Sequence, residues 1–153
     1  MALYRAAESA KPEAERLYSD VLAKGLLGTP LRLLARSRLL TNWAIWFFGE
    51  RRAPGSVGIV LARSRYIDDC LRECLAEGIE QLVILGAGYD SRAYRFEALK
   101  GKVKVFEVDH HATQNAKLRR LTSLLGSLPG QGRFVAVDFA TDGVFMCGMP
   151  HAP

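Results

Sequence analysis

The sequence predicts an α/β protein in which a helical N-terminal segment precedes a parallel β-sheet. The first half of the 153 residues shows helical spacing of apolar positions, bounded by proline and glycine. From residue 81 onward, short runs rich in β-branched residues alternate with a glycine turn and a helical segment. This order favours parallel strands joined by right-handed crossovers. We therefore expect a single domain with two parts, a helical segment over residues 1–78 that covers a bound cofactor and a sheet over residues 79–153.

Three helices are expected in the first part. One runs from Pro12 to Leu27, since proline suits a first helical turn and Lys24 lies near the end before a glycine. A second spans Leu31–Phe48, after a Gly-Thr-Pro break. A third spans Val57–Ala76 and stops at Gly78. Its apolar face is expected to comprise Tyr66, Cys70, Leu71, Cys74 and Leu75.

The most apolar stretch runs from Leu39 to Gly49 and is flanked by Arg38 and Glu50. It is far shorter than the ~20 residues that a membrane-spanning helix needs. We expect a buried helix or one that covers a cofactor, with membrane association as the weaker alternative. Residues Met1–Ala10 lack the features of a secretory signal, so a cytoplasmic location without a membrane partner is the default expectation.

The second part contains three expected strands, Gln81–Leu85, Lys102–Val108 and Arg133–Val137, with a helix over Ala112–Leu125. The first strand ends at a glycine and is expected to be buried within a parallel sheet. Residues Thr141–Pro153 show no periodicity. A three-stranded parallel sheet with an open edge is a poor endpoint. We therefore expect an incomplete C-terminal half, either in a fragment or variant chain or in one whose fold is completed by a partner's strands.

Composition excludes several functional classes. The net charge of +5 comes from scattered arginines, without the dense basic run of a nucleic-acid-binding protein. Three cysteines and no secretory signal do not indicate a disulfide framework. Cys70 and Cys74 share a helix face but have no partners at metal-ligand spacing, which favours packing over a metal site.

A glycine turn, Gly86-Ala87-Gly88, directly follows the first strand. A ligand lying across the strand ends must contact backbone there, and a side chain at either glycine would obstruct it. Asp109 follows 21 residues after Gly88, the spacing at which an acid accepts hydrogen bonds from a ribose. Glu107 lies on the same strand face and is an alternative. A second alternative is that Asp109 only caps the next helix.

Two features distinguish between cofactors. Ser91 stands where a dinucleotide-binding fingerprint has its third glycine, which points away from NAD and toward S-adenosylmethionine, a cofactor without phosphates. Asp138 ends the third strand, where a carboxylate can accept from the adenine amine, and Phe139 can lie against the ring. The alternative is an ordinary turn aspartate.

Four segments resemble the leucine carboxyl methyltransferase family: LVILGAGYDSRAYRF, VFEVDHHATQNAK, FVAVDF and, upstream, ARSRYIDD. The resemblance covers Lys11 to Phe139 and implies the Rossmann-like fold of a class I methyltransferase. It implies that Arg63, or Arg65 in another register, pairs with the carboxylate of S-adenosylmethionine, and more loosely that Arg16 contacts the cofactor. The remaining implied cofactor-binding residues are Gly86 at the methionine part, Gly88, Asp109 at the ribose, and Asp138 and Phe139 at the adenine.

The resemblance implies methyl transfer to a nucleophilic oxygen, with a carboxylate of a protein C-terminus or a small molecule as acceptor. Such an acceptor needs no general base, so no catalytic residue is assigned. His110 and His111 are disfavoured as bases because the side chains of neighbours are expected to diverge. Family members continue well past the third strand, so this chain is expected to be C-terminally truncated. The alternatives are a non-catalytic truncated cofactor-binding protein and, more remotely, an NAD(P)-dependent oxidoreductase.

Overall fold

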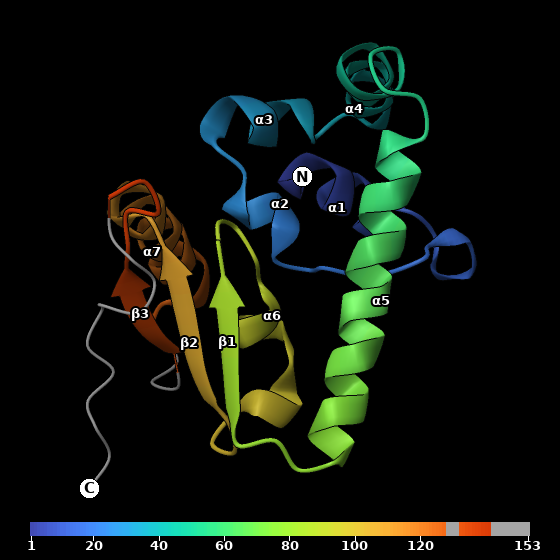
Figure 1. Cartoon of the computed structure of the whole chain (residues 1–153). Helices are drawn as coiled ribbons and strands as arrows, with labels where there is room; N and C mark the ends of the chain where they lie inside the picture. Colours follow the sequence, from blue (N-terminus) through green and yellow to red (C-terminus); the bar gives the residue numbers. More distant parts are fainter. Residues whose placement is uncertain (128–131, 142–153) are drawn as a thin grey trace, which may run out of the picture. The chain divides into compact units, whose positions relative to one another are not determined.

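The computed structural model describes residues 1–127 and 132–141 of the chain (Figure 1). The chain divides into two compact units, Met1–Gly78 and Ile79–Pro153. Each unit has its own set of secondary-structure elements.

The first unit is entirely helical. Helix α1 packs against α2, α4 and α5, and Ala6, Ala23 and Leu27 form a small apolar cluster. The elements are α1 (Ala2–Ser9), the 3-10 turn η1 (Glu13–Glu15), α2 (Ala23–Leu26), α3 (Thr29–Leu34), α4 (Arg38–Ile45), the π-helical turn η2 (Trp46–Glu50) and α5 (Ser56–Ala76).

The prediction of one helix over Pro12–Leu27 is wrong, because only η1 and α2 are helical within this range. Between η1 and α2, side chains of α1 accept hydrogen bonds from the backbone. The N–H of Leu17 donates to Glu8 Oε1 at 2.7 Å, and the N–H of Asp20 donates to Ser9 Oγ at 2.7 Å. These bonds to a neighbouring helix replace the i→i−4 bonds of a continuous helix, so tertiary contacts override the local pattern.

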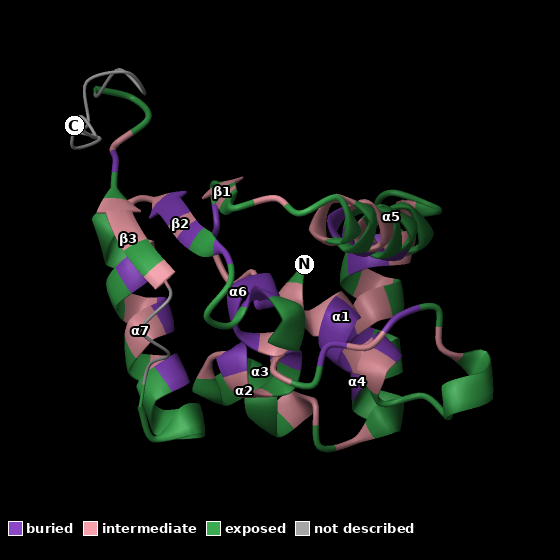
Figure 2. Ribbon diagram, turned by 90° about the horizontal axis from the view of Figure 1, so that it is seen from below, coloured by how far each residue is buried: buried purple, intermediate pink, exposed green. Residues whose placement is uncertain are grey.

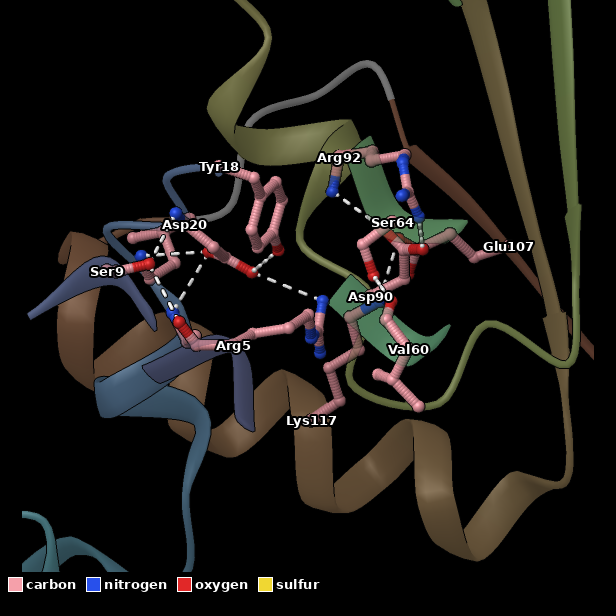
Figure 3. A network of polar contacts seen from close by, with 12 residues as sticks. Arg5, Ser9, Tyr18, Asp20, Val60, Ser64, Asp90, Arg92, Glu107 and Lys117 are labelled. Carbon is pink, nitrogen blue, oxygen red and sulfur yellow. Dashed lines mark hydrogen bonds and ion pairs between the residues drawn. The ribbon is translucent and has the colours of Figure 1, made fainter. Parts of the chain in front are cut away.

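Asp20 is the centre of this arrangement (Figure 3). Its side chain is fully buried, and Oδ2 accepts from Arg5 Nη1 and from the hydroxyl of Tyr18, both at 3.2 Å. The other oxygen, Oδ1, accepts from the N–H groups of Leu22 and Ala23 at the start of α2. One carboxylate thus satisfies the free donors of a helix N-terminus and neutralises a buried arginine.

The helix expected over Leu31–Phe48 is divided into three. Ser37 interrupts it, and its hydroxyl accepts from the N–H of Leu40 at the start of α4. The stretch also fails to be buried. Thr41, Ala44 and Gly49 are buried, whereas Leu39, Trp43 and Trp46 are 83%, 57% and 56% exposed. The sequence here is apolar all round, and one face alone packs within the unit.

Helix α5 matches the expected Val57–Ala76 to within one residue, and Gly78 follows it with a φ of +85°. The carboxylate of Glu50 holds its start by accepting from the N–H groups of Gly55 and Val57. The buried positions are Leu61, Asp68 and Leu71, whereas Tyr66 is 70% exposed, so placing Tyr66 on the packed face was wrong. No helix in the described ranges is both long enough and apolar enough to cross a membrane.

The second unit is a parallel sheet in the order β1-β2-β3, with helices on one of its faces (Figure 2). The three expected strands and the long helix are confirmed with small shifts of their ends. The α/β class with a Rossmann-like parallel sheet is confirmed as well. The elements are β1 (Gln81–Leu85), α6 (Arg92–Arg95), the 3-10 turn η3 (Glu97–Leu99), β2 (Lys104–Asp109), α7 (His111–Leu125) and β3 (Gly132–Ala136).

The expected burial of the first strand is wrong. Val83 and Leu85 of β1 are 45% and 61% exposed. Glu107 lies on the sheet face that packs against α6 and α7, and Val83 and Leu85 lie on the opposite face. β1 is also one of the two edge strands of the described sheet. The apolar sequence of β1 is typical of a central strand that is buried on both faces, but the described residues cover only one of its faces.

Replacing Asp20 by alanine is expected to destabilise the chain by about 3 kcal/mol, because it leaves the Arg5 guanidinium buried without its counter-charge. Equilibrium urea denaturation measures this change in the free energy of unfolding. The matched control is Glu13→Ala, which removes an ion pair with Arg16 from a carboxylate that is 91% exposed. The control should change stability by less than about 1 kcal/mol. Equal effects of the two variants would contradict the central role of Asp20.

Candidate functional site

The candidate site lies in the second unit, where the carboxyl ends of three parallel strands meet. The ladder continues past the strands: the N–H of Ala87 donates to Val108 O at 3.1 Å, and that of Val137 to Asp109 O at 3.0 Å. These bonds bring the glycine turn after β1, the acid at the end of β2 and Asp138 after β3 to one edge. Ligands of open α/β sheets bind at this edge.

The glycine turn is held in a conformation that favours glycine. Gly86 and Gly88 have φ values of +60° and +47°, and the N–H of Asp90 closes the turn by donating to Ala87 O at 2.7 Å. A Cβ built on Gly86 would have no neighbour within 4 Å. The space in front of this backbone is therefore open, as a ligand that contacts it requires.

Asp109 closes the site from β2. Its Oδ2 accepts from the N–H of Gly88, and its Oδ1 accepts from the N–H of His110 at 2.6 Å. The first of these bonds joins the strand end to the glycine turn. The helix-capping alternative is wrong, because His110 caps α7: its Nδ1 accepts from the N–H of Ala112 at 3.2 Å.

Glu107 and Asp109 share a strand face but occupy different environments. The Glu107 carboxylate is buried and bonds to Lys117 Nζ at 2.8 Å and to the Tyr94 hydroxyl at 3.1 Å. Burial raises the pKa of Glu107 above its ordinary value, and the positive charge of Lys117 opposes this rise. Burial and the nearby Glu107 carboxylate raise the pKa of the Tyr94 hydroxyl. Of the two acids, Asp109 is therefore the one whose surroundings leave room for a ligand.

The sequence did not identify Tyr94, Gln114 and Lys117 as important. The sequence contains a signal for two of them. Gln114, Lys117 and Leu121 have the i, i+3, i+7 spacing of one helix face, and α7 buries all three. Two of the three positions on its inward stripe are thus polar. A polar pair on the packed face of a helix indicates buried partners elsewhere in the fold.

Asp138 and Phe139 follow β3 at the same edge. Asp138 Oδ1 accepts from the N–H of Ala140 at 3.0 Å, and its carbonyl accepts from the N–H of Thr141. Asp138 therefore does form a turn, which was the alternative to a contact with adenine. The ring of Phe139 is 50% exposed. The turn role of Asp138 and its proposed contact with an adenine are compatible, since a carboxylate accepts several hydrogen bonds.

The arginines considered as candidates lie in the first unit and differ in their engagement. Arg65 Nε pairs with Asp69 at 2.7 Å, and its Nη1 donates to Leu17 O at 2.9 Å. Arg16 pairs with Glu13 at 3.3 Å. Arg63 is exposed on α5 and makes no ion pair or hydrogen bond within the described part of the chain. Of these three arginines, Arg63 is therefore the one most readily available to an anionic group.

The remaining candidates have other surroundings. The imidazole rings of His110 and His111 lie 4.2 Å apart, so the expectation that they diverge is wrong. Cys70 and Cys74 are free thiols, half-buried on α5, while Cys147 and residues 142–153 lie outside the described residues. Over residues 1–127 and 132–141, no group of His, Cys, Asp or Glu has the arrangement of a metal site.

The start of α6 is unsuited to a pyrophosphate. The helix has only four residues, and the N–H of Arg92 already donates to Asp90 Oδ1 at 2.8 Å. The same carboxylate forms an ion pair with the Arg92 guanidinium (Figure 3). A negative side chain in that position opposes a phosphate, which needs free N–H groups and positive potential. The donor set fits a ligand that carries hydroxyl groups but no phosphate.

Comparison with known sequences agrees with this chemistry. The profile of the family described as leucine carboxyl methyltransferase matches residues 1–145. A Bacillus subtilis protein, YktD, is 43% identical over 79 residues, which is 52% of this chain and 26% of YktD. Mycobacterium avium and Mycolicibacterium paratuberculosis proteins are 40% and 35% identical over 127 residues, 74% of this chain and 39% of each relative. All three are provisionally named S-adenosyl-L-methionine-dependent methyltransferases, and the chain thus spans only about a quarter to two fifths of their length.

The raised pKa of Glu107 predicts a pH dependence of stability. An acid whose folded-state pKa is raised stabilises the fold below its unfolded-state pKa of about 4.3, and this contribution is lost as the pH rises through the folded-state value. Against the double variant Glu107→Gln/Lys117→Met, the relative stability of the wild type should therefore fall as the pH rises above about 4.3. Urea denaturation across that range tests this. A constant difference would show that burial leaves the Glu107 pKa unchanged.

Proposed function

The chain belongs to the leucine carboxyl methyltransferase family, and from that premise we propose that it forms the S-adenosylmethionine-binding part of a methyltransferase. The observation that carries the proposal is the edge at which an open glycine turn faces the carboxylate of Asp109. The four-residue α6, with Asp90 at its start, favours this cofactor over a dinucleotide.

Asp109 is the proposed partner of the ribose hydroxyls. Each of its oxygens accepts one backbone N–H, and a carboxylate oxygen can accept a second hydrogen bond. Those backbone bonds also orient the carboxylate before any ligand arrives, which lowers the entropic cost of binding. Gly86 and Gly88 leave the backbone accessible, while Asp138 and Phe139 are proposed for the adenine amine and ring.

Arg63 is the proposed partner of the carboxylate at the methionine end of the cofactor. The proposal rests on the resemblance of the ARSRYIDD segment and on the engagement of Arg65 with Asp69 and Leu17. A guanidinium that need not break an existing ion pair binds a carboxylate at lower cost.

The proposed reaction is methylation of a carboxylate oxygen on a protein C-terminus or a small molecule. When bound, S-adenosylmethionine supplies an electrophilic methyl group on a sulfonium. A carboxylate acceptor is already ionised and nucleophilic at neutral pH, so the chain needs to align the two reactants and exclude water rather than remove a proton. For this reason neither His110 nor His111 is proposed as a base, and no nucleic-acid or membrane partner is proposed.

Isothermal titration of the purified chain with S-adenosylmethionine should show saturable binding, and Asp109→Asn should weaken it by roughly 10- to 100-fold. The variant keeps the shape of the side chain but removes the charge that strengthens hydrogen bonds from hydroxyl groups. Glu97→Gln, at an exposed acid of η3 paired with Lys100, is the control that should leave binding unchanged.

Transfer of labelled methyl groups to carboxylic acids and peptide C-termini, scored as base-labile ester, tests the reaction itself. Binding without transfer would support the non-catalytic alternative. Absence of binding by the folded wild type would refute the proposal for this chain, and tight NAD binding would support an oxidoreductase.

Substitution of the two arginines separates the two registers. Arg63→Gln should weaken S-adenosylmethionine binding by about tenfold or more, because it removes a charge-assisted pair. Arg65→Gln should leave it unchanged. Methylthioadenosine, which lacks the amino-acid part, should bind both variants like the wild type. A loss confined to Arg65→Gln would assign the carboxylate to Arg65 instead.

A further inference from the structure

We infer that Tyr94 and Lys117 are positioning residues, which act through Glu107 to hold the glycine turn against the carboxylate of Asp109. Their effect on cofactor affinity rests on the proposed function, whereas their effect on the geometry of the turn does not. We call Tyr94, Glu107, Gln114 and Lys117 the Glu107 network.

The network is buried and its bonds are directional. The side chains of Glu107 and Lys117 are each 1% exposed, with Nζ 2.8 Å from Oε1 (Figure 3). The hydroxyl of Tyr94 donates to the other oxygen, Oε2, at 3.1 Å. Lys117 Nζ also lies 5.4 Å from the centre of the Tyr94 ring. Both carboxylate oxygens of Glu107 are thus engaged, one by α6 and one by α7.

The elements that the network joins are those that flank the site. Three residues separate the glycine turn from the start of α6, so the bond from Tyr94 to Glu107 anchors on β2 the segment that leaves the turn. The near end of the turn is anchored by the bond from the Ala87 N–H to Val108 O. Gly88 lies between these two anchors, and its N–H reaches the carboxylate of Asp109, two residues beyond Glu107 on the same strand face.

Helix α7 adds two further contacts on the same side. Gln114 Nε2 donates to the carbonyl of Glu107 at 3.1 Å and to that of Val135 at 2.6 Å, and so ties β2 to β3 near their ends. The guanidinium of Arg120 lies 4.8 Å from the centre of the ring of Tyr89, the residue directly after Gly88. The helix that Lys117 holds against β2 therefore also contacts the residue that follows the turn.

Net stability does not account for this arrangement. Burying two charges costs about as much free energy as their attraction returns, and apolar residues of similar size are often equally stable. Apolar packing is non-directional, whereas hydrogen bonds to both carboxylate oxygens fix α6 and α7 relative to β2. The specific consequence of the network is therefore orientation at the strand end.

The test compares the wild type with Tyr94→Phe and with Glu107→Gln/Lys117→Met. The first removes only a hydroxyl, and the second removes both charges at nearly constant volume. The readout is the Gly88 amide, followed by NMR hydrogen exchange on the whole chain without ligand. Loosening of the turn should speed its exchange by about tenfold, after correction for global stability, and shift its proton resonance. Affinity for S-adenosylmethionine should fall by roughly as much.

Val103→Ala is the matched control. Val103 is buried and directly precedes β2, at the end of the strand away from Asp109, so its truncation lowers stability without removing any hydrogen bond of the network. It should leave the Gly88 amide and cofactor affinity unchanged. Wild-type Gly88 exchange in both network variants would overturn the inference. If the wild type binds no cofactor but Gly88 exchange is faster in the network variants, the proposed function is refuted and the positioning role is supported.

Discussion

The hydrogen bond from the Gly88 N–H to the carboxylate of Asp109 is the interaction on which the candidate site depends. It joins the turn after one strand to the end of the next, and it orients the acid that is proposed to meet the ribose. Gly88 adopts a positive φ there, while Gly86 leaves the adjacent backbone open. Two features of the second unit keep these strand ends in register. One is the parallel pairing of β1 with β2, and the other is the buried carboxylate of Glu107 with its partner Lys117.

Two acids on one strand face illustrate how surroundings assign different tasks to similar groups. Glu107 lies among α6 and α7, where burial raises its pKa and Lys117 supplies the counter-charge. Asp109 accepts only backbone N–H groups in the described contacts and is partly exposed. The hydrogen bonds of Glu107 are used within the protein to orient α6 and α7, whereas Asp109 keeps hydrogen-bonding capacity for a ligand.

The first unit also uses a buried carboxylate to join its elements. Buried Asp20 joins Arg5, Tyr18 and the start of α2, just as buried Glu107 joins α6 and α7. In both units a single carboxylate fixes short helices that have little stability of their own, since a helix of four residues cannot repay the cost of nucleation. By contrast, Leu39 and Trp43 of α4 and Trp46 of η2 are each more than half exposed.

The sequence by itself determined the parallel strands, the glycine turn, α5, α7 and the candidate residues at the strand ends. Period-2 and period-3.6 patterns and glycines at positive φ are local properties, so they can be read without coordinates. Only the tertiary structure decided that residues 12–27 are mostly not helical, that Leu39–Gly49 exposes an apolar face, and that Glu107 and Asp109 differ. Each of these depends on partners distant along the chain: the α1 side chains that capture the backbone at Leu17 and Asp20, the single face of α4 that packs, and Lys117 ten residues beyond Glu107. A pattern within one segment carries no information about which distant groups will satisfy it, because burial and hydrogen bonding are settled only when the elements pack.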